Sequence, residues 1–182
     1  VSNTYTLEES FGSRVVVRGA GFLLNNEMGD FNWRPGYTDR AGRIGTKPNL
    51  IAPRKRMLSS QTPTIVARDG KPVLITGSPG GRTIINTVLC VVVNVCEFEM
   101  DLKPAVDAPR LHHAWFPDRV QVEVRGDGPA QAKQRAIAEE LRKRGHEVKT
   151  IDRQGDVHSI LIRDGVYQGY ADPRIAGKAV GY

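Results

Sequence analysis

Cysteine is scarce in this chain of 182 residues, which contains only Cys90 and Cys96, both in one apolar segment. Because they are six positions apart, their side chains would face different directions on a helix, so we predict neither a disulfide nor a cysteine metal site. We interpret both as small buried apolar residues. No apolar run reaches the roughly 18 uninterrupted residues of a membrane-spanning helix, and no signal peptide is recognised within these residues.

Aromatic residues are also few, at 7% of the chain, and they are not interleaved with basic residues. This argues against binding of single-stranded nucleic acid. The net charge is +6, but the positive charges are scattered. The densest basic runs are residues 54–56 and 142–144, and the second lies in a helical pattern that also contains Glu139 and Glu140. We therefore interpret the second run as a solvated helix face and predict no nucleic-acid partner.

The hydrophobic pattern predicts a single α+β domain over residues 1–182. Alternating or β-branched runs indicate strands at residues 1–7, 14–18, 21–24, 64–67, 72–76 and 119–125, and three short ones after residue 145. Helices are predicted at residues 82–96, 101–110 with Asp101 as N-cap, and 129–144 with Ala136, Ile137 and Leu141 on the apolar face and Gly145 as the stop.

Two connections stand out between these elements. Asp69-Gly70 separates two strand-like runs and is the best hairpin signal in the sequence. Residues 33–57 are rich in glycine, proline and charge and form the longest irregular stretch. A loop of that length in a compact domain is functional or disordered.

Residues 74–89 read LITGSPGGRTIINTVL, so Gly80 and Gly81 lie where a strand passes into a long apolar segment. Unpaired N–H groups at a helix N-terminus can hold an anion, either a phosphate or a developing oxyanion. The segment lacks the spacing and the Lys-Ser/Thr ending of a phosphate loop. From spacing alone, a tight turn with glycines at positive φ is favoured, an oxyanion hole comes second and a phosphate site third.

Three carboxylates form a second candidate group. Glu27 and Asp30 lie three positions apart after a strand-like run, and Glu8 ends the first predicted strand. If they gather, they would hold an ammonium, and they would raise one another's pKa unless a cation lies between them. Taken singly, such acids are more often solvated surface groups.

Adjacent hydroxyls and adjacent histidines complete the set. Ser59 and Ser60 would either donate to a carboxylate or form a plain turn. His112 and His113 would point apart in a strand, so they cannot share a metal, and a packing or supporting role is favoured. We predict no metal site and no cofactor.

Taken together, these stretches resemble the small C-terminal subunit of γ-glutamyltranspeptidases. The resemblance covers essentially the whole chain and is densest up to residue 113. Five stretches carry it in the family's order: NTYTL (3–7), GFLLNNEMGDF (21–31), KRMLSSQTPTIV (55–66), ITGSPGGRTIINTVL (75–89) and DAPRLHH (107–113).

The resemblance implies the αββα sandwich of N-terminal-nucleophile hydrolases, of which this chain would be the C-terminal part. In that family a precursor cuts itself, and the new N-terminal Thr of the small subunit becomes the nucleophile, with its own amino group as base. The γ-glutamyl group of a glutathione-like donor then passes to water or to an amino acid or peptide amine. Family members are often periplasmic or secreted.

The resemblance also implies roles for the candidate residues. Gly80 and Gly81 would form the oxyanion hole, and Thr6 would face the amino group of the nucleophile. Tyr37 falls where the family carries a lid loop. The donor would be bound through its carboxylate and its ammonium by two sets of residues: Ser59 with Ser60, and Glu27 with Asp30.

Two departures from the family pattern matter. Glu8 stands where the family commonly has Asn, so a third carboxylate joins the ammonium site. The segment expected to carry the nucleophile Thr, some 15–20 residues before Thr6, is absent from this chain. We therefore expect the chain to be inactive alone and to need the large subunit of its precursor, which would also supply a basic residue for the donor carboxylate.

Other functions stay open at this point. One is a related amidase of the same superfamily, such as a cephalosporin or glutaryl acylase. Another is a family member that has lost catalysis and acts as a binding or structural protein.

Overall fold

The computed structural model describes residues 1–32 and 34–181. The chain forms two compact units, which we call the sheet unit (Val1–Thr4 with Gln61–Tyr182) and the loop unit (Tyr5–Ser60). None of the described helices is long and apolar enough to cross a membrane. In chain order the elements are η1 (Glu27–Asp30), η2 (Lys47–Asn49), β1 (Thr64–Arg68), β2 (Lys71–Gly77), η3 (Gly81–Thr83), α1 (Ile84–Cys96), α2 (Leu102–Asp107), β3 (Leu111–His113), β4 (Val120–Glu123), α3 (Gly128–Lys143), β5 (Val148–Ile151), β6 (His158–Arg163) and β7 (Val166–Tyr170).

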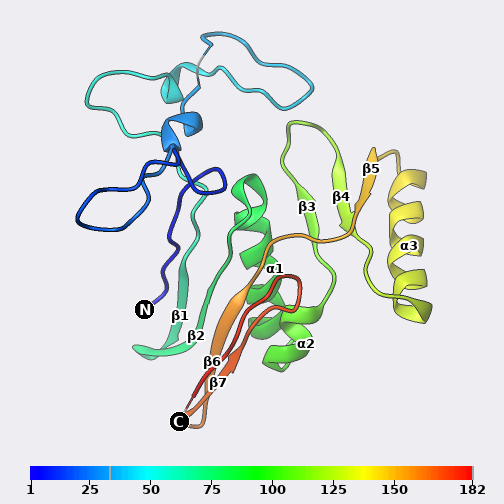
Figure 1. Ribbon diagram of the computed structural model, residues 1–182. Helices are drawn as coiled ribbons and strands as arrows, with labels where there is room; N and C mark the ends of the chain where they lie inside the picture. Colours follow the sequence, from blue (N-terminus) through cyan, green and yellow to red (C-terminus); the bar gives the residue numbers. More distant parts are fainter. Residues whose placement is uncertain (33, 182) are drawn as a thin grey trace. The chain divides into compact units, whose positions relative to one another are not determined.

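The main sheet of the sheet unit has four antiparallel strands in the order β1-β2-β6-β7 (Figure 1). Its first two strands form the expected hairpin, and the turn residues Asp69 and Gly70 have φ angles of 51° and 75°. Two consecutive positive φ angles match the right-handed twist of the flanking strands, and an Asp-Gly pair adopts them readily. The hairpin prediction is therefore confirmed.

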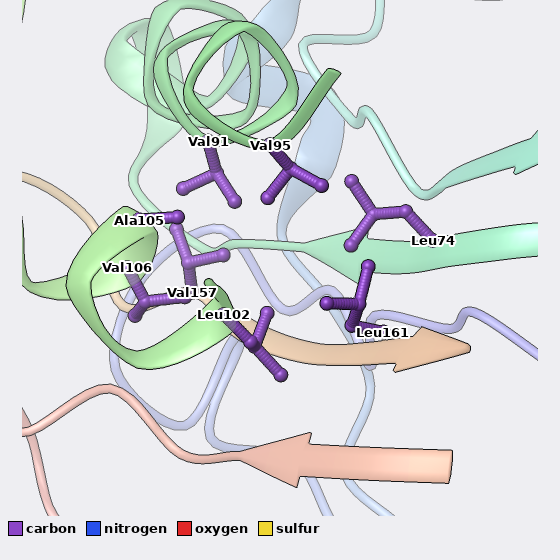
Figure 2. Packing of buried hydrophobic residues seen from close by; sticks show 8 residues of the cluster. All are labelled: Leu74, Val91, Val95, Leu102, Ala105, Val106, Val157 and Leu161. Carbon is purple, nitrogen blue, oxygen red and sulfur yellow. The ribbon is translucent and has the colours of Figure 1, made fainter. Parts of the chain in front are cut away.

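The hydrophobic core lies between one face of this sheet and helices α1 and α2. Leu74 of β2 and Leu161 of β6 are register partners, and both are buried. Figure 2 shows their side chains directed toward Val91 and Val95 of α1. Because burial of each such side chain contributes about 1.5–3 kcal/mol, this packing fixes α1, and with it the turn at its N-terminus, to the sheet. The rest of the cluster comes from α2 and the segment before β6: Leu102, Ala105, Val106 and Val157.

The opposite face of the main sheet is also apolar. Ile75 is paired with Ile65 on one side and with Ile160 on the other, so the three side chains share that face. Ile65 is 54% exposed, and Tyr167 of β7, on the same face, is 70% exposed. A sheet that is apolar on both faces is typical of one packed between two layers.

A smaller sheet has the order β3-β4-β5, with β3 antiparallel and β5 parallel to β4. Helix α3 connects the two parallel strands and lies beside them (Figure 1). The predicted helix stop at Gly145 is confirmed by its φ of 90° and by its N–H, which bonds to the Arg142 carbonyl at 2.9 Å. Most of the described strands and helices lie where the sequence pattern predicts them, so the predicted α+β class is confirmed.

The buried face of α3 differs from the prediction. Ala136 and Ile137 are exposed, whereas Gln134 and Ala138 are buried. The Gln134 side chain accepts a 2.7 Å hydrogen bond from the Arg125 backbone N–H, so a polar residue is stable on the inner face. The pattern of apolar residues alone therefore predicts the wrong buried face for α3.

Residues 1–7 do not form the predicted strand. Residues 1–6 still alternate between exposed and half-buried, with Thr4 and Thr6 both half-buried, as expected for one face of an extended chain. Residues 14–18 and 21–24 also fall short of two full strands. They pair through a single antiparallel bridge between Val16 and Leu23.

Two smaller predictions are corrected as well. Asp101 occupies the N-cap position of α2, but its side chain makes no capping bond and instead accepts a bond from Arg163 at 3.1 Å. Cys90 and Cys96 are free thiols, as expected, yet Cys96 is exposed and is not a core residue.

Candidate functional site

The glycine pair forms a tight turn between β2 and α1 in the sheet unit. Strand β2 ends at Gly77, η3 begins at Gly81, and α1 continues from Ile84. Gly80 has a φ of 139° and Gly81 a φ of 53°, conformations that residues with a side chain rarely adopt. A Cβ at Gly80 would lie 2.8 Å from Thr83 Oγ1, whereas a Cβ at Gly81 would meet nothing within 4 Å.

Hydrogen bonds from Ser78 and Thr83 hold this turn. The buried Ser78 hydroxyl donates to the Pro79 carbonyl at 2.6 Å and accepts the Asp156 N–H at 3.0 Å. Thr83 donates to the Gly80 carbonyl twice, through its N–H at 3.1 Å and its hydroxyl at 3.0 Å. Sequence reasoning missed these residues, because Ser78 and Asp156 are 78 positions apart.

The N–H groups of the two glycines point to a different use. In the described part of the chain, neither the Gly80 nor the Gly81 N–H donates to a protein acceptor, and both glycines are exposed. Exposed, unpaired N–H groups at a helix N-terminus attract negative charge. The turn can therefore receive an anionic oxygen.

The predicted carboxylates come together in the loop unit. One oxygen from each of Glu8, Glu27 and Asp30 lies within 4.8 Å of the other two. Two hydrogen bonds between residues 7–9 and 25–27 support this arrangement: the Leu7 carbonyl accepts the Asn26 N–H at 3.2 Å, and the Asn26 side-chain Oδ1 accepts the Glu9 N–H at 3.1 Å. The three acids are thus a cluster in space, and not separate surface groups.

The negative charges of these three carboxylates repel one another. Burial, a hydrogen bond with Asp30, and the charges of Asp30 and Glu8 raise the pKa of Glu27 to about 7. Partial burial and the charges of Asp30 and Glu9 also raise the pKa of Glu8. Glu27 is 9% exposed, and its Oε1 is buried without a hydrogen-bond partner. A cation between these carboxylates would relieve their repulsion, and an ammonium or a hard metal ion has the required charge.

The other predicted residues of the loop unit lie on irregular backbone. Ser59 is exposed and Ser60 half-buried, and Thr6 is half-buried. The half-buried Tyr37 ring lies below the Arg34 guanidinium, 4.6 Å from ring centroid to Cζ, and its hydroxyl accepts a 3.2 Å bond from Arg43. The irregular stretch predicted from residue 33 is confirmed apart from η2 and a bridge between Asn32 and Leu50, while residue 33 itself lies outside the described residues.

The histidine pair behaves as the sequence predicts. His112 is 3% exposed and its Nδ1 lies 3.1 Å from Asn86 Oδ1. His113 lies on the other face of β3 and contacts Asp118 at 3.1 Å. Burial, followed by the charges of Arg82 and His113, lowers the pKa of His112. The two rings thus have different partners; His112 is buried, whereas the His113 side chain is 39% exposed.

A buried network of two ion pairs also escaped sequence analysis. Arg174 contacts Glu123 at 2.5 Å and Arg110 contacts Asp172 at 2.8 Å, and all four side chains are at most 1% exposed. Burial alone would raise the pKa of Asp172, but the Val157 N–H and the Arg110 guanidinium together hold that pKa below its ordinary value. The network ties the segment after β7 to β4 and α2.

Comparison with known proteins gives consistent matches. The family described as Gamma-glutamyltranspeptidase matches residues 1–182. The chain is 43% identical over 175 residues to the glutathione hydrolase proenzyme of Escherichia coli and 43% identical over 186 residues to that of Pseudomonas aeruginosa. These alignments cover 96% and 100% of this chain but 29% and 32% of the relatives, so the chain spans about a third of the length of the proteins it matches.

Solved structures agree in fold. The gamma-glutamyltranspeptidase from Pseudomonas nitroreducens, complexed with L-DON, superimposes with a TM-score of 0.84 at 40% identity, covering 100% of this chain and 93% of that chain. The Helicobacter pylori gamma-glutamyltranspeptidase gives a TM-score of 0.81 at 43% identity, covering 96% of this chain and 93% of that one. From the turn, the carboxylate cluster and these matches together, the chain belongs to the gamma-glutamyltranspeptidase family and has the fold of the N-terminal-nucleophile hydrolases.

Proposed function

We propose that residues 1–182 are the small-subunit, C-terminal domain of a γ-glutamyltransferase or glutathione hydrolase. The γ-glutamyl group would pass from a glutathione-like donor to the N-terminal Thr of the processed precursor, and then to water or to an amino acid or peptide amine. The names and identities of the relatives support this reaction class.

The carboxylate cluster is the observation that carries the proposal. The raised pKa of Glu27 and its unpartnered buried oxygen mean that the cluster lacks a cation among the described residues. The α-ammonium of a γ-glutamyl donor supplies one positive charge and three N–H donors, which suits three carboxylates. Glu8, Glu27 and Asp30 therefore act as the ammonium clamp. A glutaryl group has the same carbon chain and carboxylate but no ammonium, so it would leave the clamp unpaired.

The glycine turn supplies the complementary charge stabilisation. The exposed N–H groups of Gly80 and Gly81 would receive the carbonyl oxygen as it becomes negative during acyl transfer. Removal of one such donor in other enzymes costs about 2.7–4 kcal/mol of transition-state stabilisation.

The remaining predicted residues keep supporting roles in this proposal. Ser59 and Ser60 would donate to the α-carboxylate of the donor, and Thr6 would orient the amino group of the nucleophile. Tyr37 would lie in the lid over the site, and its contacts with Arg34 and Arg43 would stiffen that loop.

The large subunit of the same precursor is the proposed partner. The second apolar face of the main sheet, which carries Ile65, Ile75 and Ile160, suits the other sheet of an αββα sandwich. Covering this face would bury side chains that are otherwise in water, such as Ile65. The small subunit would then contribute one helical layer and one sheet layer.

One assay separates this proposal from its alternatives. The complete processed protein is given a γ-glutamyl anilide and the matched glutaryl anilide, which differ only in the α-ammonium. We expect kcat/KM to favour the γ-glutamyl substrate, and Asp30→Asn to reduce that preference about tenfold or more, the range for a lost charged hydrogen bond. Turnover of the glutaryl substrate alone would support an acylase instead. Lack of turnover of both by properly processed protein would indicate a non-catalytic family member.

A further inference from the structure

The proposed oxyanion hole must hold two N–H groups in a fixed direction, yet its backbone consists of two conformationally flexible glycines. Glycine populates positive and negative φ with similar ease, so two adjacent glycines do not fix the direction of their own peptide groups. Preorganised donors stabilise a transition state because they need no reorganisation as the charge develops. Something outside the two glycines must therefore hold these peptides in place.

Peptide geometry shows what can do this. The Pro79–Gly80 and Gly80–Gly81 peptides are trans. In a trans peptide the C=O and the following N–H point in opposite directions. A group that holds the Pro79 carbonyl therefore sets the direction of the Gly80 N–H, and one that holds the Gly80 carbonyl sets that of the Gly81 N–H.

We propose that Ser78 and Thr83 are positioning residues that aim the two N–H groups of the oxyanion hole, an inference that rests on the proposed function. Each hydroxyl binds one of the two carbonyls, Ser78 that of Pro79 and Thr83 that of Gly80, and the Thr83 N–H also donates to the Gly80 carbonyl at 3.1 Å. Both N–H groups consequently face away from these hydroxyls, and both are left without a protein acceptor in the described chain.

The direction of the Ser78 bond is fixed by its surroundings. Ser78 is 3% exposed, and its oxygen already accepts the Asp156 N–H at 3.0 Å. A hydroxyl has one proton, and this one lies 2.6 Å from the Pro79 carbonyl. The segment around Asp156 therefore anchors Ser78, and Ser78 anchors the peptide that carries the Gly80 N–H.

Gly155 makes this anchor possible through a close approach. A Cβ at Gly155 would lie 2.7 Å from Ser78 Oγ and 2.5 Å from Thr87 Cγ2, so any side chain there would displace the serine hydroxyl. Gly155 has a φ of 66°. Gly165 has a φ of 76° and nothing within 4 Å of a Cβ, so it offers the same backbone strain without the clash.

The test uses two matched pairs of variants in the complete processed protein. Thr83→Val removes the hydroxyl and keeps the shape, while Thr83→Ser restores the hydroxyl. Gly155→Ala introduces the clash with Ser78, while Gly165→Ala carries only the strain. The measured quantities are kcat and KM for a γ-glutamyl anilide, together with crystal structures of the wild type and of Thr83→Val.

We expect Thr83→Val and Gly155→Ala to lower kcat about tenfold with little change in KM, which is less than the hundred- to thousandfold for a donor removed outright. Thr83→Ser and Gly165→Ala should stay within about twofold of wild type, since the bond and the contact are kept. A normal kcat in Thr83→Val, or equal damage in Thr83→Ser, would overturn the inference. So would an unchanged Gly80–Gly81 peptide orientation in the crystal structure of Thr83→Val. An inactive wild type would refute the proposed function, and the peptide orientation would still decide whether Thr83 aims the N–H.

Discussion

Replacing Arg174 with methionine should strongly destabilise the sheet unit. The Arg174 side chain is fully buried and its guanidinium donates five hydrogen bonds. Two go to the two oxygens of Glu123, one goes to Asp172, and the others go to the backbone carbonyls of Val106 and Ala108. Methionine fills much of the same volume but satisfies none of these acceptors.

The size of the effect follows from the charge balance. Arg110 and Arg174 face Glu123 and Asp172, so the buried network is neutral, and loss of Arg174 leaves one uncompensated negative charge. Removal of one member of a buried pair costs about 3–5 kcal/mol. A whole domain is stable by only about 5–15 kcal/mol. With roughly 2–4 °C lost per kcal/mol for a cooperative unit of this size, we expect the unfolding transition of the sheet unit to fall by about 6–20 °C.

Scanning calorimetry of the complete protein measures this change, and two further variants interpret it. Arg174→Met combined with Glu123→Leu removes the orphan charge with its partner, and it should recover part of the lost stability. Arg142→Met breaks an exposed pair with Glu139 on α3 and should cost about 0–1 kcal/mol. If Arg174→Met unfolds within 2 °C of wild type, or if the double variant is no more stable than the single one, then this electrostatic reasoning is wrong.

The candidate sites allow further predictions. Gly80→Ala should lower kcat more than Gly81→Ala, because only the first Cβ meets Thr83 Oγ1, at 2.8 Å; equal kcat values would contradict this. Competitive inhibition by L-glutamate should strengthen as pH rises from 6 to 8, because Glu27, with a pKa of about 7, becomes ionised over this range. Below pH 7 the affinity for L-glutamate should fall about tenfold per pH unit. Glutarate, which lacks the ammonium, should not share this trend, and parallel pH profiles for the two inhibitors would exclude the clamp. Glu8→Asn should raise protein stability, since residue 8 has a φ of 71°, which Asn tolerates well. The same substitution should weaken glutamate binding, and tighter binding would count against a role for Glu8.

Local signals predicted those elements that need no distant partner. The Asp69-Gly70 turn requires only its own backbone angles, and the helix at residues 84–96 follows from a long apolar run. Residues 1–7 have a strand pattern, but a strand also needs a regular ladder of backbone hydrogen bonds to a neighbour, and the described residues 1–7 are not part of a strand. Pattern alone therefore predicts extended backbone, and not pairing.

The candidate site was likewise only partly predictable from the sequence. The identities of the carboxylates and glycines were available from motifs, whereas the raised pKa of Glu27 depends on its distances to Asp30, three positions away, and to Glu8, 19 positions away. Ser78 and Arg174 carried no signal because their partners are 78 and 51 positions away. Such contacts become visible only when the fold brings the segments together.

The carboxylate cluster of the loop unit and the glycine turn of the sheet unit are electrostatically incomplete in opposite senses, and in the proposed function each matches a different part of the donor. The carboxylate cluster has excess negative charge and an unpartnered buried oxygen, so it favours a group that stays positive throughout a reaction. The glycine turn has unpaired donors and no side-chain charge of its own, so it favours an oxygen whose charge grows only in the transition state. A γ-glutamyl donor has both features, a permanent ammonium and an acyl carbonyl. Variants of the cluster should therefore change ground-state affinity, while variants behind the turn should change kcat, and a reversal of these two effects would mean that the roles have been assigned to the wrong residues.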